Sequence, residues 1–462
     1  MTSTLPPVIS PESVHTSHDT DLPVVVVGAG PVGLAAAAHL LSYGLTPLVL
    51  EAGERVGAAI RDWAHVRTFT PWRYLVDGAA EKLLAPTGWV RPDGDVPPTG
   101  GEIVARYLEP LAAALHSHVR TGARVVAVSR LGTDKARSVG REQAPFVVRV
   151  RDRDGEVSEI TARAVVDASG TWGRPNPLGA SGLPARGEEE AVAADLVVGP
   201  LPDVLGRDRE RFAGRRTLVV GSGHSAANTL LDLVRLAEEE DGTEVVWAVR
   251  RADASRVFGG GEADQLPARG RLGTDLRAAV RGRGVEQVTG FSTTELRVAA
   301  DGESVDVVGA TPDGGHVIRG VNTVVAATGF RPDLGILGEV RVELDPGLES
   351  PARLAPLIDP AFHSCGSVPP HGHRELAQPE PGLYVVGMKS YGRAPTFLVT
   401  TGNEQVRSVA AAIAGDLEAA DEVRLVLPET GVCSVDLARE EGSPAAAVGV
   451  AAGLAAVGAC CS

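Results

Sequence analysis

The sequence predicts an α/β fold with two doubly wound parallel sheets, the second inserted into a discontinuous first unit. An apolar strand, a glycine turn and a helix follow one another at 24–43, and the same order returns at 217–238. Parallel strands need such crossover helices, so the repeat is typical of doubly wound sheets. A third strand and glycine turn begin at 383, too late in the chain to belong to the second unit. We therefore expect the chain to return to its first sheet.

Length, charge and cysteine content exclude several classes of protein. The 462 residues suit two or three domains, and the net charge of −15 argues against nucleic acid or an anionic membrane as partner. No membrane-spanning helix is expected, because no stretch of about 20 apolar residues occurs. Residues 1–20 lack a basic start and an apolar core, which predicts a disordered leader and not a signal peptide. Four cysteines crowded toward one end form no disulfide framework, which favours the cytoplasm.

The first glycine turn has the spacing G-x-G-x-x-G and follows four valines that predict a buried strand. Gly28 permits the tight turn, and Gly30 lets the backbone approach a pyrophosphate closely. Pro31 begins a helix that runs to about Tyr43, and the amide groups at its start attract that pyrophosphate. Gly33 completes the spacing, so the turn predicts a dinucleotide site.

The next predicted strand, Thr46–Leu50, ends in an acidic residue. Glu51 follows the glycines by about 20 residues, the position at which a carboxylate accepts the hydroxyls of an adenosine ribose. This order of strand, glycine turn, helix, strand and acid predicts a dinucleotide site far more specifically than the glycines alone.

The loop after this strand gathers aromatic residues in a chain that is otherwise poor in them. Trp63, Phe69, Trp72 and Tyr74 fall close together, so the loop, and Thr70–Tyr74 in particular, is a candidate for covering a flat ring system. The alternative is that these rings are ordinary core and surface aromatics.

Further predicted elements lead to a second candidate turn. A helix is expected over 101–117, and strands over 124–128, 146–150, 158–161 and 164–168. The last strand ends in Ser169 and Gly170, a tight turn at the carboxyl end of a strand, where open α/β sheets bind ligands. The proline-rich run 175–184 is typical of a linker.

Past this linker the opening pattern returns as G-x-G-x-x-A. Gly221, Gly223 and Ala226 carry the spacing, with Ser225 between the last two, and a helix is expected over Ala227–Glu238. The chain therefore contains a second candidate pyrophosphate turn.

The strand that follows, Glu244–Val249, ends in Arg250 and Arg251, where the first unit has Glu51. A carboxylate repels a 2'-phosphate, whereas two guanidiniums can bind one. We therefore expect NADPH in the second unit and a different dinucleotide in the first. The alternative is that both arginines merely lie solvated at a strand end.

The rest of the chain completes the first unit. A hairpin is expected from 296–310 and 316–318, and the strand 323–327 runs into T-G-F-R-P. Leu383–Val386 predicts a strand that enters a third glycine turn at Gly387, with a helix from about residue 403. Such folds place the ring and ribityl end of FAD at this turn, so Gly387 is a candidate flavin contact. The expected domains are 21–178 and 331–427 for FAD, 179–330 for NADPH, and 428–462 for a C-terminal tail.

Taken together, these motifs resemble those of the flavoproteins that bind two dinucleotides, in particular the flavin-containing monooxygenase type. The resemblance rests on V-V-G-A-G-P-V-G-L at 26–34, A-S-G-T-W-G-R-P-N-P at 168–177, V-V-G-S-G-H-S-A at 219–226 and A-A-T-G-F-R-P at 326–332. It implies two Rossmann-like domains, FAD reduced by NADPH, and molecular oxygen used to oxidise a soft heteroatom or a carbonyl. The histidine-containing fingerprint of that family is missing, since no histidine occurs between Ser181 and Arg215.

The motifs and the resemblance together assign two sets of residues to the cofactors. The FAD set is Gly28, Gly30, Pro31, Gly33, Glu51, Ala52, Trp63, Val126, Ser169, Gly170 and Gly387. The NADPH set is Gly221, Gly223, Ser225, Ala226, Arg250 and Arg251. No catalytic side chain is assigned, because in such enzymes the cofactor carries the chemistry.

The carboxyl-terminal part narrows the resemblance. H-S-C-G-S-V-P-P-H-G at 363–372, L-P-E-T-G-V-C-S at 427–434 and the terminal C-C-S are similar to flavoprotein monooxygenases of actinobacterial arsenic-resistance operons. This resemblance implies a cytoplasmic FAD and NADPH enzyme that acts in arsenic detoxification.

Three of the four cysteines lie in the tail. A helix is expected from Ser443 to Ala459, too short to span a bilayer, and it ends in Cys460 and Cys461. Together with Cys433, these thiolates suit a soft ion such as trivalent arsenic or antimony. The alternative is a frayed tail that happens to end in cysteines.

We expect a monooxygenase that moves electrons from NADPH through FAD to oxygen and oxidises a trivalent arsenical or a similar soft small molecule. The rival is an NADPH-dependent reductase of disulfides or thiol-bound metalloid. Since residues 1–364 contain no cysteine, its dithiol would have to be Cys460 and Cys461, reaching the flavin, for instance in the partner of a homodimer. A third hypothesis is a flavoprotein that sequesters metalloid and turns nothing over.

Overall fold

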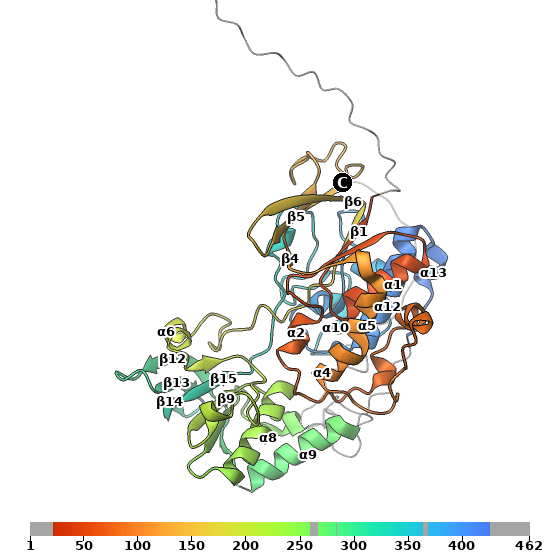
Figure 1. Ribbon diagram of the computed structural model, residues 1–462. Helices are drawn as coiled ribbons and strands as arrows, with labels where there is room; N and C mark the ends of the chain where they lie inside the picture. Colours follow the sequence, from red (N-terminus) through yellow and green to blue (C-terminus); the bar gives the residue numbers. More distant parts are fainter. Residues whose placement is uncertain (1–21, 259–266, 283, 364–367, 426–462) are drawn as a thin grey trace, which may run out of the picture.

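The computed structural model describes residues 22–258, 267–282, 284–363 and 368–425. The chain forms two lobes (Figure 1), of which the larger holds the first and last parts of the chain and the smaller holds the part between them. The predicted leader, the tail 428–462 and all four cysteines lie outside the described residues. Within those described ranges, no helix combines the length and hydropathy needed to cross a bilayer.

The larger lobe is built on a five-stranded parallel sheet in the order β16-β7-β1-β2-β3. Its strands are β1 (Val24–Val27), β2 (Pro47–Leu50), β3 (Val119–Arg120), β7 (Ala164–Asp167) and β16 (Leu383–Val385). Because β16 pairs with β7, the late segment completes the sheet that the first segment begins. This is the discontinuous arrangement that the third glycine turn predicts.

Helices of the larger lobe lie around this sheet. They are α1 (Pro31–Ser42), α2 (Ala58–Arg61), α3 (Gly78–Leu84), α4 (Gly100–Ile103), α5 (Glu109–Leu115), α10 (Ala355–Ile358), α11 (His373–Leu376), α12 (Val399–Ala414) and α13 (Leu417–Asp421). A π-helical turn, η3 (Val104–Leu108), joins α4 to α5, so the segment predicted as one helix is helical with one irregular turn. Short 3-10 turns are η1 (Trp72–Tyr74), η2 (Ala85–Thr87), η4 (His116–His118), η7 (Gly335–Leu337) and η8 (Gly387–Tyr391).

The valines of β1 show why both faces of the sheet are covered. Successive side chains of a strand point to opposite faces. Val24 and Val26 therefore belong to the core shared with α1 and α12, whereas Val25 and Val27 pack against a small antiparallel sheet. That sheet has the order β4-β5-β6, with β4 (Ala123–Arg130), β5 (Phe146–Asp152) and β6 (Val157–Ala162). A continuous apolar run suits a strand that is buried on both faces.

The smaller lobe repeats this plan with the strand order β11-β10-β9-β15-β8. Its sheet consists of β8 (Val197–Val198), β9 (Arg216–Val220), β10 (Glu244–Ala248), β11 (Glu286–Val288) and β15 (Thr323–Ala326), all paired in parallel. Helices α8 (His224–Glu239) and α9 (Pro267–Arg281) share one core with the sheet. The remaining helical pieces of this lobe are α6 (Glu188–Ala193), α7 (Arg209–Phe212) and η5 (Ser255–Phe258).

The other face of the second sheet carries three antiparallel strands where a hairpin is predicted. They are β12 (Ser292–Val298), β13 (Val305–Thr311) and β14 (Gly314–Val321). The predicted long strand 296–310 is wrong, because a tight turn interrupts it. In that turn Gly302 N donates to Ala299 O at 2.9 Å, and Ala299 N donates to Ser304 O at 2.9 Å.

Two antiparallel segments connect the lobes. Asn176 N donates to Gly329 O at 2.9 Å, and Arg331 N donates to Arg174 O at 3.0 Å. The ring centroids of Trp172 and Phe330 lie 4.8 Å apart beside these bonds. The chain thus leaves and re-enters the larger lobe at one place, and residues at that place face both lobes.

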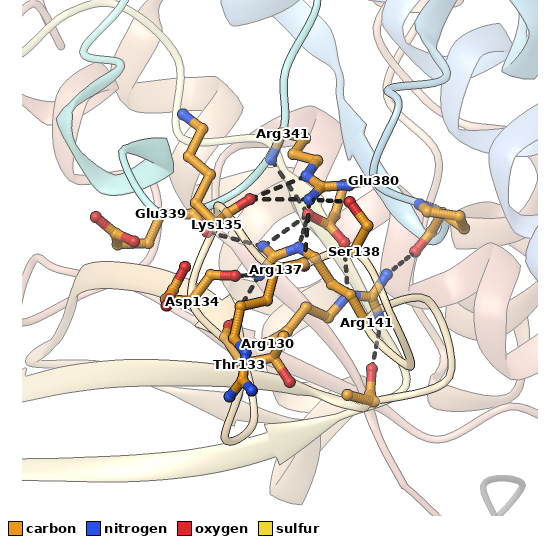
Figure 2. A network of polar contacts seen from close by, with 12 residues as sticks. Arg130, Thr133, Asp134, Lys135, Arg137, Ser138, Arg141, Glu339, Arg341 and Glu380 are labelled. Atoms are coloured by element: carbon orange, nitrogen blue, oxygen red, sulfur yellow. Dashed lines mark hydrogen bonds and ion pairs between the residues drawn. The ribbon is translucent and has the colours of Figure 1, made fainter.

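A buried ion network fixes the small sheet of the larger lobe to the late part of the chain (Figure 2). Glu380, which is 1% exposed, accepts from Arg130 Nε at 2.8 Å and from Arg141 Nη2 at 2.8 Å. The Arg341 N–H donates to the same carboxylate at 3.2 Å. Burial acts to raise the pKa of Glu380, but these hydrogen bonds from Arg141, Arg130 and the Arg341 backbone outweigh it, so the pKa lies below its usual range.

We predict that Glu380→Gln lowers the free energy of unfolding by about 3–5 kcal/mol, because it leaves two buried guanidiniums without a counter-charge. Urea denaturation measures the change. The matched control is Glu159→Gln, whose partner Arg149 lies on the surface, and this variant should lose less than about 1 kcal/mol. Equal, small losses in both variants would contradict a structural role for the network.

Candidate functional site

A cavity of about 540 Å³ lies at the carboxyl ends of the strands of the first sheet. It brings together eight of the eleven residues assigned from the sequence to FAD. These are Gly28, Gly30, Pro31, Glu51, Ala52, Ser169, Gly170 and Gly387. Five separate segments, 27–62, 124–125, 168–174, 333–336 and 387–399, therefore meet around one space.

The three glycines of the first turn are needed for different reasons. Gly28 has φ +98°, and a Cβ there would lie 2.8 Å from Ala168 O. A Cβ on Gly33 would lie 2.0 Å from Gly28 O, so Gly33 lets α1 pack against the turn. A Cβ on Gly30 would meet no atom within 4 Å, so this residue opens toward the cavity. No side chain caps the start of α1, which leaves its first amide groups available to an anion.

Glu51 lies at the end of β2 with its carboxylate held on both sides. Its Oε2 accepts from Ala29 N at 2.7 Å, and its Oε1 accepts from Gly53 N at 2.7 Å. These two backbone bonds fix the carboxylate at the rim of the cavity. A ribose there would use the lone pairs that remain on each oxygen.

The third glycine turn is held by a buried chain of side chains that the sequence did not predict. Gly387 N donates to Gln405 Oε1 at 2.7 Å, and Gln405 Nε2 donates to His371 Nε2 at 2.9 Å. The His371 ring must then carry its proton on Nδ1, which donates to Pro369 O at 3.0 Å. Burial lowers the pKa of His371, so the neutral ring is the stable form.

A second unpredicted group of side chains lies between the cavity and the sheet. Lys389 Nζ forms an ion pair with Asp167 Oδ2 at 2.6 Å and donates to Ser169 Oγ at 3.0 Å. Ser169 Oγ in turn donates to Asp167 Oδ1 at 2.6 Å. Lys389 and Asp167 are almost fully buried, yet Lys389 is among the residues that line the cavity.

Three of the residues assigned to FAD, Gly33, Trp63 and Val126, do not line this cavity. A Cβ on Gly100 would lie 2.7 Å from the Trp63 ring, which shows that the indole packs on the start of α4. Val126 lies at a bulge in β4, and its neighbour Val125 lines the cavity in its place. Gly33, the third assigned residue outside the lining, packs against the turn as described above.

The aromatic loop does not cover the cavity as expected. Trp72 is 1% exposed in the core of the larger lobe, which leaves it no face for a ligand. Phe69 instead reaches the smaller lobe, where its ring centroid lies 4.8 Å from that of His224. The aromatic rings that line the cavity are those of Trp172 and Phe397.

The second glycine turn has the same geometry in the smaller lobe. Gly221 has φ +137°, and a Cβ there would lie 2.1 Å from Ala327 O. A Cβ on Gly223 would meet no atom within 4 Å, and α8 begins directly after it without a side-chain cap. The helix starts three residues earlier than predicted, and Ser225 and Ala226 lie in its first turn. This end of α8 is therefore a second candidate anion site.

Arg250 and Arg251 lie exposed at the carboxyl end of β10. Arg250 Nη1 donates to Ala180 O at 3.3 Å, and within the described part of the chain neither guanidinium forms an ion pair with a carboxylate. A cavity of about 440 Å³ lies beside them, lined in part by Ala252 and Gly290. The two arginines and the glycine turn lie at the carboxyl ends of β10 and β9, and the lining of this cavity includes neither arginine and no residue of the turn.

A further cavity of about 380 Å³ lies where the two connecting segments meet the smaller lobe. Asp62 and Trp172 line both this cavity and the larger one, and Trp172 Nε1 donates to Asp62 Oδ2 at 2.7 Å. The ring of Phe330 and the loop at Leu201 form other walls. A small molecule in this space would lie next to the candidate cofactor cavity.

The cysteines assigned to a metalloid, Cys433, Cys460 and Cys461, lie outside the described residues. Among the residues that the structure describes, no cluster of three histidine, cysteine or acidic side chains could hold a metal ion. The metalloid assignment therefore stays a sequence-based prediction.

Residues 25–352 match the model of a family described as "Pyridine nucleotide-disulphide oxidoreductase". The chain is similar to a ferredoxin–NADP reductase of Ignicoccus hospitalis, with 28% identity over 308 residues that cover 67% of this chain and 77% of that protein. Its structure resembles the bacillithiol disulfide reductase Bdr of Bacillus cereus, with TM-score 0.64 and 20% identity over 85% of this chain and 99% of the other. It also resembles the structure of DfoA from Erwinia amylovora, a cadaverine monooxygenase bound to FAD, with TM-score 0.59 and 16% identity. This match covers 88% of this chain and 97% of DfoA. These likenesses confirm the predicted fold class.

We predict that His371 makes stability depend on pH. Its pKa is lowered in the folded state from a usual value of about 6.5, so its contribution is present above that pH and is lost as the pH falls through the folded pKa. Urea unfolding from pH 8 to pH 5 should show that the parent protein loses on the order of 1 kcal/mol more stability than His371→Gln. Identical pH profiles would show that the ring is not held neutral.

Proposed function

Since the chain belongs to the pyridine nucleotide-disulphide oxidoreductase family and is a flavoprotein oxidoreductase that uses FAD and NADPH, we propose that molecular oxygen accepts its electrons. The enzyme is then a flavoprotein monooxygenase that acts on a small, soft substrate. When bound, FAD takes electrons from NADPH and passes them on, so the protein must bind, orient and shield the reactants.

The larger lobe supplies the FAD site in this proposal. The open face of Gly30 and the uncapped start of α1 accept the pyrophosphate, and the fixed carboxylate of Glu51 accepts the adenosine ribose. The turn at Gly387 and the start of α12 also line this cavity, and in this proposal they contact the ring and ribityl part of FAD.

The smaller lobe supplies the NADPH site. The glycine turn at Gly221 and Gly223 accepts the pyrophosphate, and Arg250 and Arg251 bind the 2'-phosphate. Among the residues that the structure describes, neither guanidinium forms an ion pair, which supports a role in binding a ligand.

The distribution of cysteines favours oxygen over a disulfide as the acceptor of the electrons. A disulfide reductase passes electrons from the flavin to a thiol pair placed beside it. The sequence has no cysteine before residue 365, so the segments 27–62 and 168–174 that line the candidate FAD cavity contain none. Trp172 and Phe397 occupy its walls instead, and such rings help to keep water from a reactive cofactor.

The substrate is proposed to be a trivalent arsenical or a related thiol-bound species, bound in the cavity next to Asp62 and Trp172. The support is the resemblance of the C-terminal cysteine motifs to those of arsenic-resistance monooxygenases, and the thiophilic character of Cys433, Cys460 and Cys461. The oxidation detoxifies because the pentavalent product no longer binds thiols tightly. We place the enzyme in the cytoplasm.

The alternative is an NADPH-dependent reductase of disulfides or metalloids, with the C-terminal pair as its dithiol. It is favoured by the structural likeness to a bacillithiol disulfide reductase. This reading requires Cys460 and Cys461 to approach the flavin of their own chain or of the partner in a homodimer.

We predict that Arg250→Ala/Arg251→Ala raises the KM for NADPH by about tenfold to a hundredfold, as expected for lost bonds to a charged phosphate, and leaves the KM for NADH unchanged. Anaerobic flavin reduction followed in a stopped-flow instrument measures both. Arg235→Ala, which removes an exposed arginine from α8, is the matched control and should behave like the parent. Equal losses for NADPH and NADH would rule out the phosphate contact.

We predict that trivalent arsenicals stimulate NADPH consumption and oxygen uptake by the FAD-loaded protein. Cys460→Ser/Cys461→Ser should keep reduction of the flavin by NADPH and reoxidation by oxygen, because neither step uses the tail. An oxygen electrode and the absorbance of NADPH measure the two rates in parallel. Absence of stimulation by any arsenical would overturn the substrate, whereas complete loss of turnover in the cysteine variant would favour the reductase.

A further inference from the structure

We infer that Lys389 is a ligand of the FAD diphosphate, a buried cation that Asp167 and Ser169 hold against the cofactor cavity. The inference concerns how FAD is held, and it stands whether or not oxygen accepts the electrons. Lys389 is one of three lysines in a chain with 44 basic residues, and it lies directly after the third glycine turn.

The stability of the fold does not explain a lysine at this position. Lys389 and Asp167 are 1% and 0% exposed, and their ion pair spans 2.6 Å. The free energy lost when two charges are removed from water is about as large as the free energy gained from their attraction. An apolar pair of similar size would therefore stabilise the core equally well. A role toward a ligand does explain it, because Lys389 also lines the cavity.

The hydrogen bonds of the Lys389 ammonium group leave one donor for a third acceptor. An ammonium group has three N–H donors. Among the described residues, Asp167 Oδ2 and Ser169 Oγ accept two of them, at 2.6 and 3.0 Å. The third donor is available to an acceptor in the cavity.

The position of Ser169 identifies which part of FAD supplies that acceptor. A Cβ on Gly28 would lie 3.0 Å from the Ser169 Cα, so Ser169 packs directly on the pyrophosphate turn. A Cβ on Gly387 would lie 3.3 Å from Val32 in the first turn of α1. Lys389 thus lies between the first and third glycine turns, where a cation complements the negative charge that the amide groups of α1 also attract.

The test is the affinity of the apo-protein for FAD in two variants. Lys389→Met should weaken FAD binding by about tenfold to a hundredfold, the range expected for losing one hydrogen bond to a charged group. Asp167→Asn/Lys389→Met removes both charges of the buried pair and should bind FAD as weakly as the single variant. Lys135→Met, which removes an exposed lysine of the larger lobe, is the control and should bind FAD like the parent.

Two outcomes would overturn the inference. If the double variant regains the affinity of the parent, the loss in Lys389→Met comes from the unpaired Asp167 and not from a missing ligand of FAD. If Lys389→Met leaves FAD affinity intact but shifts the midpoint potential by about 30 mV or more, a tenfold difference between redox states, the lysine acts on the ring and not on the diphosphate. The double variant decides the question even if Lys389→Met fails to fold, because it leaves no uncompensated charge.

Discussion

The parallel pairing of β7 with β16 is the contact on which the fold and the candidate site both depend. It joins Asp167 to Lys389, which lie 222 positions apart, and Val386 N donates to Asp167 O at 2.9 Å beside them. Parallel strands need a long connection, and here the connection contains the whole smaller lobe. The cavity can form only after the late segment has returned, because it supplies the third glycine turn and the start of α12.

The sequence was sufficient for those parts of the fold that local patterns determine. The four valines of β1 and the spacing of Gly28, Gly30 and Gly33 are fixed by burial and by backbone geometry, so they predict strand, turn and helix directly. Helix α8 begins directly after Gly223, three residues before the expected start, just as α1 begins directly after Gly30; only α1 has a proline at its first position to indicate that start. The turn within 296–310 does carry a sequence signal, Asp301-Gly302, so the three-stranded sheet of the smaller lobe could have been predicted.

The parts of the site that depend on distant partners could not be predicted. The bond from Gly387 to Gln405 and on to His371 requires α12 to pack under the third turn. The Trp63 indole packs on Gly100 at the start of α4 and does not line the cavity. The sequence pattern of the loop does not show this contact with a distant residue. For Lys389 a signal did exist: it is one of three lysines among 44 basic residues, and it follows the third glycine turn by two positions.

The two lobes divide the work of an electron-transfer enzyme. One holds a fixed carboxylate beside an open glycine turn, and the other holds two exposed arginines beside a similar turn; in the proposed function this difference lets each lobe select its own dinucleotide. The acceptor of the electrons is the central claim, and a single-turnover oxygen balance tests it most directly. FAD-loaded protein is reduced with one equivalent of NADPH and mixed with isotopically labelled oxygen and a trivalent arsenical. If oxygen accepts the electrons, the product gains one labelled oxygen atom for each NADPH oxidised. Unlabelled product, or full turnover without oxygen when a disulfide is supplied, would contradict it.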